Sequence, residues 1–456
     1  MEAQNKPAAA AEKAAENTQA PSLETSSTKL IRYGGFGIVE TTLEGTQNLN
    51  PEKKARKKIF LTETAKQDER DQLQKRLQLI LDLLNGADTV ADMVQQAQSK
   101  SEAAQTLLNE NLRRTFETTR DLERSYRSVA NFFTNTEQDK VRNVSIMNAE
   151  IDQLTDLDNT LFLDAVNEEF SRNYDRLDLK DNYSILALPG YLGSRKVVDK
   201  WARIAYKHKV MMLTDFQHLD APGDVLDLFE AANMTGSDPY LSNVMMACNW
   251  LVGRGKFQEV GEEEDLHVPA SSALAGKVYN TLMSQVTAGR KYGALNDVDG
   301  VAFPLKKSEI ASLERLGLIP MVAEYGKVMP FSAKTLFNGD NIGLQTYSVV
   351  RVFDYITKVL IDFLNRRAFE NFNVNTRMDI QKQIVRFLDK ITGPGKLIEK
   401  FKILRFEQDP KQKDRIYLDI HMVPYFPAKS FLIKLDGQKG DDPDSAEWKS
   451  DYAQQQ

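Results

Sequence analysis

Strand and helix patterns alternate along the middle of the chain, from Lys140 to Val322. Short apolar runs typical of strands are separated by segments with a helical period. Strands joined by crossover helices form a mostly parallel sheet that helices cover on both faces. We therefore predict an α/β body. The expected strands are KVRNVSIM, YSILALP, KVMMLTDF, LSNVMMACNW, LIPMV and KVMPF, and the expected helices are Leu161–Tyr174, Arg195–Lys207, Val225–Ala232, Ser271–Met283, Ser308–Leu316, Tyr347–Phe369 and Met378–Ile391.

A helical N-terminal region is expected before this body. Apolar residues recur with a helical period from Thr62 to Phe133, and Asn85 and Gly86 predict a break between two helices. Ser101, followed by Glu102 and Gln105, predicts the capped start of the second helix. Residues 1–28 lack an apolar period and are expected to form a flexible tail, and Leu30–Glu40 predicts a short strand.

Three strand-like runs follow the body: Phe401–Phe406, Arg415–Val423 and Ser430–Leu435. Apolar and more polar residues alternate in the longest run, as in a strand with one buried face. Such strands either complete the chain's own sheet or pair with a neighbouring subunit. A break at Gly393, Pro394 and Gly395 separates these runs from the body. The apolar positions of the runs are Phe401, Ile403, Leu404, Phe406, Ile416, Leu418, Ile420, Met422, Phe431, Ile433 and Leu435.

The composition of the chain is that of a globular protein rather than a membrane-spanning or nucleic-acid-binding one. The chain has 456 residues, 41% hydrophobic and 27% charged, which is typical of a globular protein, and its net charge of -6 predicts no general attraction to nucleic acid or anionic membranes. The basic run Lys53–Lys58 is interpreted as a solvated lead-in to a helix. Cys248, the single cysteine, is expected to be buried, and no apolar run reaches membrane-spanning length. These features predict a soluble, cytoplasmic protein.

The chemistry-bearing residues form no strong catalytic motif. Asp215, His218, Asp220 and Asp224 follow an expected strand and could bind a divalent metal or act as acid and base; alternatively, Asp224 caps a helix and the others are solvated. LPGYLGS could present backbone N–H groups to a phosphate, but a tight turn with Ser194 as a helix cap explains it more simply. The trio Asp265, His267 and Ser271 has no Gly-x-Ser-x-Gly elbow nearby. We predict no enzyme, cofactor or metal.

The segment Leu122–Val129, LERSYRSV, resembles the Leu-Glu-x-Ser-Trp-Arg-Gly-Leu signature of the large contractile-sheath subunit of bacterial type VI secretion systems, the TssC family. Further similar segments follow in the same order. Tyr126 replaces the usual Trp and Ser128 the usual Gly, which suggests a divergent, Bacteroidetes-like branch. These segments are VRNVSIMNAEIDQL, EEFSRNYDRLDLKDNYSILALPGY, KVVDKWARIAYKHKVMMLTDF, LGLIPMV, YSVVRVFDYITKVLIDFL and RIYLDIHMVPYFPAKSFLIKL.

The resemblance implies a structural subunit that pairs with the small sheath subunit (TssB) and stacks with further copies of itself in sixfold rings around the inner tube protein (Hcp). It also implies a baseplate and an AAA+ unfoldase (ClpV) as partners. The C-terminal strands would join strands of neighbouring subunits, with Gly393, Pro394 and Gly395 as part of a hinge. Two alternatives remain: a metal-dependent α/β enzyme using the Asp215–Asp224 loop, and a phage-tail-like sheath subunit.

The predicted organisation has five parts. They are a flexible tail at residues 1–28, a strand and helical region at 29–135, the α/β body at 136–392, the inter-subunit strand module at 396–436 and a second flexible tail at 437–456.

Overall fold

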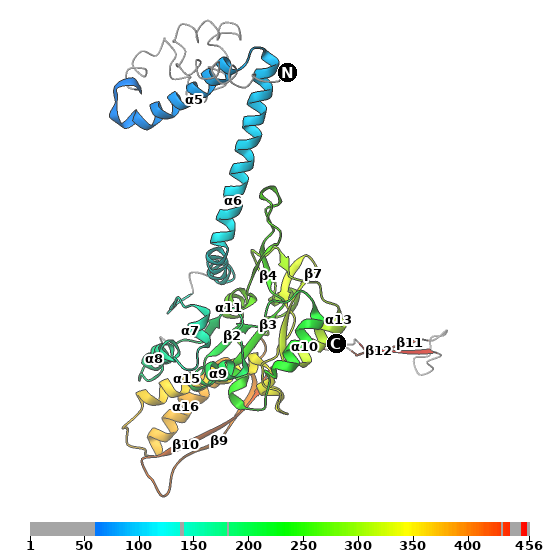
Figure 1. Cartoon of the computed structure of the whole chain (residues 1–456). Helices are drawn as coiled ribbons and strands as arrows, with labels where there is room; N and C mark the ends of the chain where they lie inside the picture. The colour runs from blue at the N-terminus through cyan, green and yellow to red at the C-terminus, as the bar shows by residue number, and fades with distance from the viewer. Residues whose placement is uncertain (1–59, 137–140, 180–181, 430–431, 438–447, 454–456) are drawn as a thin grey trace, which may run out of the picture. The chain divides into compact units, whose positions relative to one another are not determined.

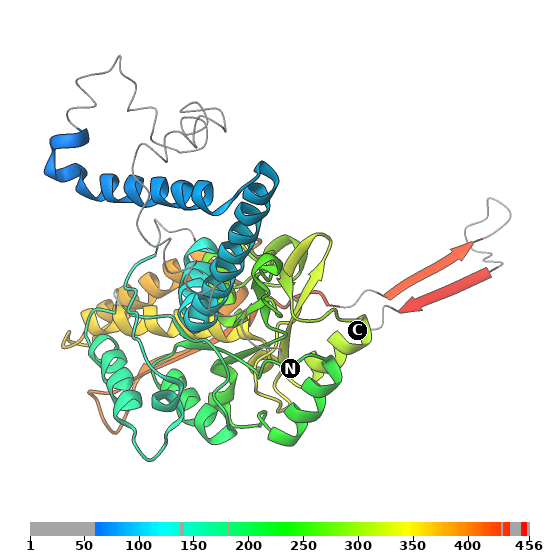
Figure 2. The same cartoon turned by 45° about the horizontal axis from the view of Figure 1, so that its top comes forward.

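The computed structural model describes residues 60–136, 141–179, 182–429, 432–437 and 448–453 (Figures 1 and 2). The chain divides into two compact units, Met1–Thr115 and Phe116–Gln456. The expected tail at residues 1–28, the strand at Leu30–Glu40 and the basic run all lie outside the described residues.

Two long helices follow the 3-10 turn η3 (Thr64–Lys66). Helix α5 (Gln67–Gly86) ends at the predicted break, and α6 (Val90–Thr134) runs through Ser101, so the predicted start at Ser101 is wrong. The cap is Thr89, whose Oγ1 accepts from the Asp92 backbone N–H at 3.2 Å and donates to Asp92 Oδ2 at 2.7 Å. Thr89 with Asp92 three positions later supplies the capping pair, whereas Ser101 stands among good helix formers.

A five-stranded sheet forms the centre of the second unit, in the order β1, β2, β3, β7, β8. The first four strands are parallel, and β8 pairs with β7 antiparallel through a tight turn. The predicted α/β fold with a mostly parallel sheet is confirmed. The strands are β1 (Ile185–Leu188), β2 (Met211–Asp215), β3 (Val244–Cys248), β7 (Leu318–Glu324) and β8 (Lys327–Pro330).

Helices cover both faces of this sheet (Figures 1 and 2). Along β2, Met212 enters one core cluster, while Met211 and Leu213 enter the other. The first face packs on α8 (Leu161–Tyr174), α9 (Arg195–Lys207), α10 (Pro222–Ala232) and α13 (Lys307–Arg315), and the second on α11 (Ala270–Asn280) and the start of α15 (Tyr347–Arg366). Cys248 is buried in the first cluster.

Smaller elements connect this framework. A three-stranded antiparallel sheet has the order β5, β4, β6 and lies beside α11 in the second core cluster. Its strands are β4 (Leu251–Arg254), β5 (Leu266–Val268) and β6 (Gly300–Val301). The short helical elements are α7 (Ile151–Thr155), η5 (Pro239–Asn243), η6 (Gln258–Val260), α12 (Gly289–Tyr292) and α14 (Ile342–Gln345).

The first predicted strand, KVRNVSIM, is absent from the described part of that segment. Residues 141–150 form neither helix nor strand, and Val144, Ile146 and Met147 are exposed. Its apolar residues alternate with polar ones, whereas strands buried on both sides of a parallel sheet are almost continuously apolar. The sheet therefore begins at β1.

The C-terminal hairpin packs on the chain's own helices. Strands β9 (Ile398–Gln408) and β10 (Ile416–Pro424) pair antiparallel, and one face lies against α15 and α16 (Val374–Ile391) in a third core cluster (Figures 1 and 2). Its central side chains are Val352, Ile356, Ile380, Ile384, Leu388, Leu397 and Ile398, packed against Phe401, Ile403, Phe406, Leu418, Ile420 and Met422. The chain's own helices therefore cover much of this apolar face.

A β-bulge explains the pattern in β9. Asp419 pairs with Arg405 and Ile420 pairs with Ile403, so Leu404 has no residue opposite it. The extra residue lets Ile403 and Phe406 share the covered face and leaves Leu404 62% exposed.

The Gly-Pro-Gly segment forms a hydrogen-bonded turn between α16 and β9. Gly393 and Gly395 have positive φ angles of 121° and 72°. The Gly393 N–H donates to the Ile398 carbonyl at 3.0 Å, and the Leu397 N–H donates to the Ile391 carbonyl at 3.0 Å. A hinge at this turn stays a prediction.

A second hairpin extends past the expected end of the strands. Strand β11 (Leu432–Gly437) pairs antiparallel with β12 (Trp448–Ala453). Because β12 lies within residues 437–456, that segment is not a tail throughout. The run WKSDYA is a weak strand signal because its aromatic residues are separated by charged and polar ones.

We expect Leu418→Lys to destabilise the folded subunit itself, by about 2 kcal/mol, because the ammonium would replace an apolar contact with α15 and α16. The matched variant Leu404→Lys, at the exposed bulge, should change the free energy of unfolding by less than about 0.5 kcal/mol. Urea unfolding followed by circular dichroism measures both. Equal losses in the two variants would contradict the packing of β10.

Candidate functional site

Asp215, the first residue of the expected metal loop, is a buried structural acceptor at the end of β2. Its Oδ2 accepts from the Gly190 N–H at 2.9 Å and from Ser271 Oγ, and its Oδ1 accepts from the Ser271 N–H at 2.8 Å. Burial raises the pKa of Asp215 to about 6, although hydrogen bonds from Gly190 and Ser271 oppose the rise. The carboxyl group thus joins β2 to the turn after β1 and to the start of α11.

The other members of that loop lie elsewhere. The His218 ring lies 4.5 Å from the His267 ring and 5.3 Å from the Trp250 ring, measured between centroids. Asp224 stands in the first turn of α10, whose N-cap residue is Ala221. Within the described ranges, no group of three or more His, Cys, Asp or Glu side chains could hold a metal ion. The loop residues therefore do not converge as a metal site would require.

The two weaker motifs are also used structurally. Ser271 bonds to Asp215, while Asp265 accepts from the Lys256 N–H at 2.9 Å, so Asp265, His267 and Ser271 form no relay of hydrogen bonds. In LPGYLGS, the Gly190 N–H that could have faced a phosphate donates to Asp215. Ser194 occupies the N-cap position of α9, but its side chain makes no capping hydrogen bond.

The pH dependence of stability should report the burial of Asp215. Its folded pKa of about 6 exceeds the ~3.9 typical of unfolded aspartate, so folding takes up a proton between these values. The favourable contribution is complete below about pH 3.9 and is lost as the pH rises through 6. We compare the free energies of unfolding of wild type and Asp215→Asn. The wild-type value minus the variant value should fall by about 1–3 kcal/mol between about pH 4.5 and 7.5. Urea titrations at both pH values measure it, and a rising difference would contradict the raised pKa.

The signature segment of α6 is fixed to the body by a buried ion network. The Arg254 guanidinium, 8% exposed at the end of β4, donates to Glu123 at 2.9 Å and to Glu262 at 2.6 Å. Arg127 bonds both Glu123 at 2.9 Å and the Gly253 carbonyl at 2.9 Å. The ring of Phe116 stacks on that of Phe257 at 4.9 Å. A mostly buried cation between two carboxylates therefore joins α6 to the β4 hairpin.

Two glycines permit this close approach. A Cβ at Gly276 in α11 would collide with the Phe132 carbonyl oxygen of α6, and a Cβ at Gly253 would lie 2.9 Å from Val268 Cγ1 and 3.2 Å from Arg127 Cδ. Backbone and side chain of α6 thus rest directly on α11 and β4.

Sequence reasoning missed the role of Glu262. The run EEED beginning there predicts an exposed acidic loop, yet the Glu262 side chain is only 9% exposed. The available signal was Arg254 within the apolar strand LVGR, because a buried arginine requires a carboxylate partner.

The opposite side of the signature segment is exposed. Leu122 and Tyr126 are each 71% exposed and Val129 is 41% exposed, at a spacing that places them on one helix face. The predicted apolar stripe of α6 is therefore split: Phe116 packs inward, whereas these three side chains face away from the core of the unit.

We expect Glu123→Gln to lower the free energy of unfolding by about 1–3 kcal/mol, because Arg254 would keep only one charged partner in a buried setting. The matched control is Glu168→Gln, which breaks an equivalent i,i+4 pair with Arg172 where the two side chains are 66% and 64% exposed. That control should cost less than about 0.5 kcal/mol. Thermal and urea unfolding measure both variants, and equal costs would refute the buried network.

The C-terminal hairpins leave strand edges open. In the described part of the chain, β9 and β10 form one two-stranded sheet and β11 and β12 another, so each strand has one edge without a partner strand, apart from the single bridge between Ile398 and Thr392. Such edges can pair with strands of another chain. Among the predicted inter-subunit residues, Leu404, Ile416 and Ile433 are exposed, Leu435 lies opposite Ser450 in the β11–β12 register, and Phe431 lies outside the described residues.

Family models of the type VI secretion system TssC/VipB proteins match three consecutive parts of the chain. The N-terminal region matches residues 23–112, the central domain residues 114–338 and the C-terminal domain residues 346–454. The chain belongs to the TssC/VipB family. It is therefore a contractile-sheath subunit of type VI secretion, as the resemblance at Leu122–Val129 implied. The C-terminal match begins one residue before α15, which agrees with the shared core of α15, α16, β9 and β10.

Solved structures of sheath proteins are also similar. The contracted helical sheath of the anti-feeding prophage is 17% identical with a TM-score of 0.47, covering 69% of this chain and 81% of that chain. The contracted PVC sheath complex of an extracellular contractile injection system is 14% identical with a TM-score of 0.43, covering 66% and 89%. A sheath tail protein from Desulfitobacterium hafniense is 12% identical with a TM-score of 0.35, covering 53% and 56%. No curated protein matches the sequence.

Membrane insertion through a helix finds no support in the described residues. None of the helices there combines the length and the apolar character that crossing a bilayer requires.

Proposed function

We propose that this TssC/VipB protein pairs with the small sheath subunit (TssB) and polymerises in sixfold rings around the inner tube protein (Hcp). Contraction of this lattice would propel the tube and its spike. The observation that carries the proposal is the match of all three TssC/VipB parts, in order, across residues 23–454. The central polar residue Asp215 serves packing, which favours a structural role over the alternative of a metal-dependent enzyme.

Neighbouring subunits are linked in this proposal through strand edges. The covered face of β9 and β10 belongs to the chain's own core, so the edges and the β11–β12 hairpin are the parts available for main-chain pairing. Backbone pairing suits a moving lattice because it connects subunits without requiring their bodies to share a core.

The contraction of the sheath would use this division between the α/β body and the linking strands. The α/β body, with its two buried core clusters, moves as a nearly rigid unit, while the linked strands keep the subunits connected. The turn at Gly393, Pro394 and Gly395 forms part of the hinge, and any larger displacement includes α15 and α16, which share a core with β9 and β10. The free energy comes from inter-subunit contacts that differ between the extended and contracted lattices, and the stroke uses no nucleotide.

Further partners are proposed for sheath assembly and for recycling after contraction. We infer a cytoplasmic protein whose sheath starts on a baseplate and whose contracted form is recycled by an AAA+ unfoldase (ClpV). The TssC/VipB match favours a type VI sheath over the alternative of a phage-tail sheath.

Removal of residues 430–456 tests the strand-linked lattice. The three core clusters lie within residues 132–422. The truncated chain should therefore stay folded, with an unchanged unfolding midpoint, because the described elements that it loses are β11 and β12 alone. Co-expressed with the small subunit, the full chain should form long tubes in negative-stain micrographs and the truncated chain should not. Normal tubes from the truncated chain would refute a linkage through β11 and β12, whereas a discrete small oligomer from the full chain would refute the sheath function itself.

A further inference from the structure

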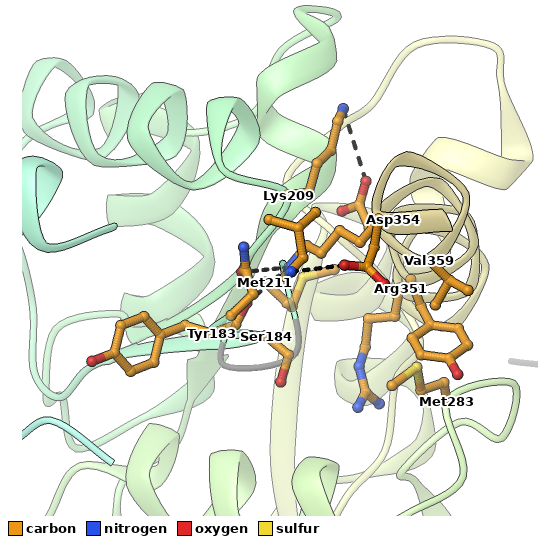
Figure 3. A pocket seen from close by; sticks show the side chains of 13 residues that line it. Tyr183, Ser184, Lys209, Met211, Met283, Arg351, Asp354 and Val359 are labelled. Atoms are coloured by element: carbon orange, nitrogen blue, oxygen red, sulfur yellow. Dashed lines mark hydrogen bonds and ion pairs between the residues drawn. The ribbon is translucent and has the colours of Figure 1, made fainter. Parts of the chain in front are cut away.

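A cavity of about 320 Å³ lies where helix α15 meets the amino-terminal ends of β1 and β2 (Figure 3). Its volume is at the lower end of the ~300–1,000 Å³ typical of small-molecule sites. It lies at the opposite edge of the sheet from Asp215, which stands at the carboxyl end of β2. The lining comprises Leu179, Asn182, Tyr183, Ser184, Lys209, Met211 and Met283, together with Arg351, Asp354, Tyr355, Lys358, Val359 and Asp362 of α15.

Arg351 is a buried cation with an unused donor. Its side chain projects from α15 beside Met283 (Figure 3), and the residue is only 8% exposed. Nη2 donates to the Val278 carbonyl at 3.1 Å, whereas Nη1 is buried and has no hydrogen-bond partner among the described residues. Burial lowers the pKa of Arg351 to about 10, so the guanidinium still carries its charge at neutral pH. Buried donors are rarely left without an acceptor.

Lys358 and Asn182 add donors from two sides of the cavity. The Lys358 ammonium donates to Asn182 Oδ1 at 3.2 Å and to the Tyr183 carbonyl at 2.8 Å, which uses two of its three N–H groups. Asn182 Nδ2 is buried without a partner in the described part of the chain. Burial lowers the pKa of Lys358 to about 8, which leaves it mainly charged at neutral pH.

The two carboxylates of the lining each have partners, and the charge of Asp354 acts on both Lys209 and Lys358. Asp354 accepts from Asn243 Nδ2 at 2.7 Å and lies 3.9 Å from Lys209 Nζ. Asp362 accepts from the Leu179 N–H at 3.0 Å and from Arg366 Nη2 at 2.8 Å.

Across the described residues, neither Arg351 nor Lys358 has an ion pair within 4 Å. The lining sets Lys209, Arg351 and Lys358 against Asp354 and Asp362, and Asp362 is also bound by Arg366, so positive charge is in excess. The polar atoms without a described partner, Arg351 Nη1 and Asn182 Nδ2, are donors.

We propose that this cavity binds a small oxyanion, a carboxylate or a phosphate, with Arg351 as the principal ligand and Lys358 and Asn182 as supporting donors. A planar guanidinium and an ammonium match the negatively charged oxygens of such a group, and partial burial strengthens these hydrogen bonds. The bound anion joins α15 to the segments that precede β1 and β2. Because α15 also contributes to the core under β9 and β10, occupancy stabilises the junction between the sheet and the C-terminal core. The site does not depend on the proposed sheath function.

The full-length chain can be titrated with sodium phosphate and, separately, with sodium acetate, against sodium chloride at matched ionic strength. Calorimetry should show saturable binding of one anion per chain, and the thermal unfolding midpoint should rise with anion concentration relative to chloride. Binding of phosphate alone identifies a phosphate site, and binding of acetate as well identifies a general carboxylate or phosphate site.

Variants locate the site. Arg351→Met and Lys358→Met should each weaken anion binding at least tenfold. Circular dichroism establishes whether each variant folds. If Arg351→Met does not fold, the anion affinity of Lys358→Met tests the proposal. The control Arg386→Gln changes an exposed cation of α16 and should bind the anion like wild type. The proposal is overturned if neither anion binds more than chloride does, or if a folded cavity variant keeps wild-type affinity. Loss of binding in Arg386→Gln alone would equally overturn it by placing the anion on α16.

Discussion

Helix α15 takes part both in the core beneath the central sheet and in the core beneath β9 and β10. Its first turns place Tyr347 and Val350 in the core beneath the central sheet, and the next turns place Val352 and Ile356 in the core beneath β9 and β10. A third face carries Arg351, Asp354 and Lys358 into the cavity before β1 and β2. Because one rigid helix takes part in all three environments, the C-terminal hairpin could be displaced only together with α15 or by repacking against it.

Buried polar groups in this chain fix elements to one another. Asp215 holds the turn after β1 and the start of α11 at the end of β2, and Arg254 holds the signature segment of α6 against β4 through Glu123 and Glu262. In both places, the cost of burying a charge or a raised-pKa carboxyl group is offset by several hydrogen bonds. Such connections define one packing arrangement, because separating the paired groups would cost free energy.

Local pattern predicted most elements of the body because each buried strand and amphipathic helix has a period that its own residues determine. The helices at Leu161–Tyr174 and Arg195–Lys207 were predicted with the observed bounds. The wrong predictions concern residues whose structure depends on tertiary contacts rather than on their sequence neighbours. KVRNVSIM has strand-like residues but no place in the sheet, Ser101 resembles a cap but lies within a continuous helix, and Glu262 looks solvent-exposed by its neighbours yet pairs with a buried arginine. The unmatched donors of Arg351 and Asn182 could not be predicted, because they arise from segments distant in the sequence.

The sequence alone determined the family, the α/β class and the alternation of β10, since each depends on the order and period of residues along the chain. Only the tertiary structure decided what covers that alternating face. Leu418, Ile420 and Met422 lie on the chain's own α15 and α16, and a bulge at Leu404 brings Ile403 and Phe406 to the same side. The physical reason is that a strand's period specifies that one face must be buried but does not specify the partner. That choice depends on which apolar surface the folded chain brings within reach, and here the chain's own helices cover the face while the outer strand edges have no partner strand in the described part of the chain.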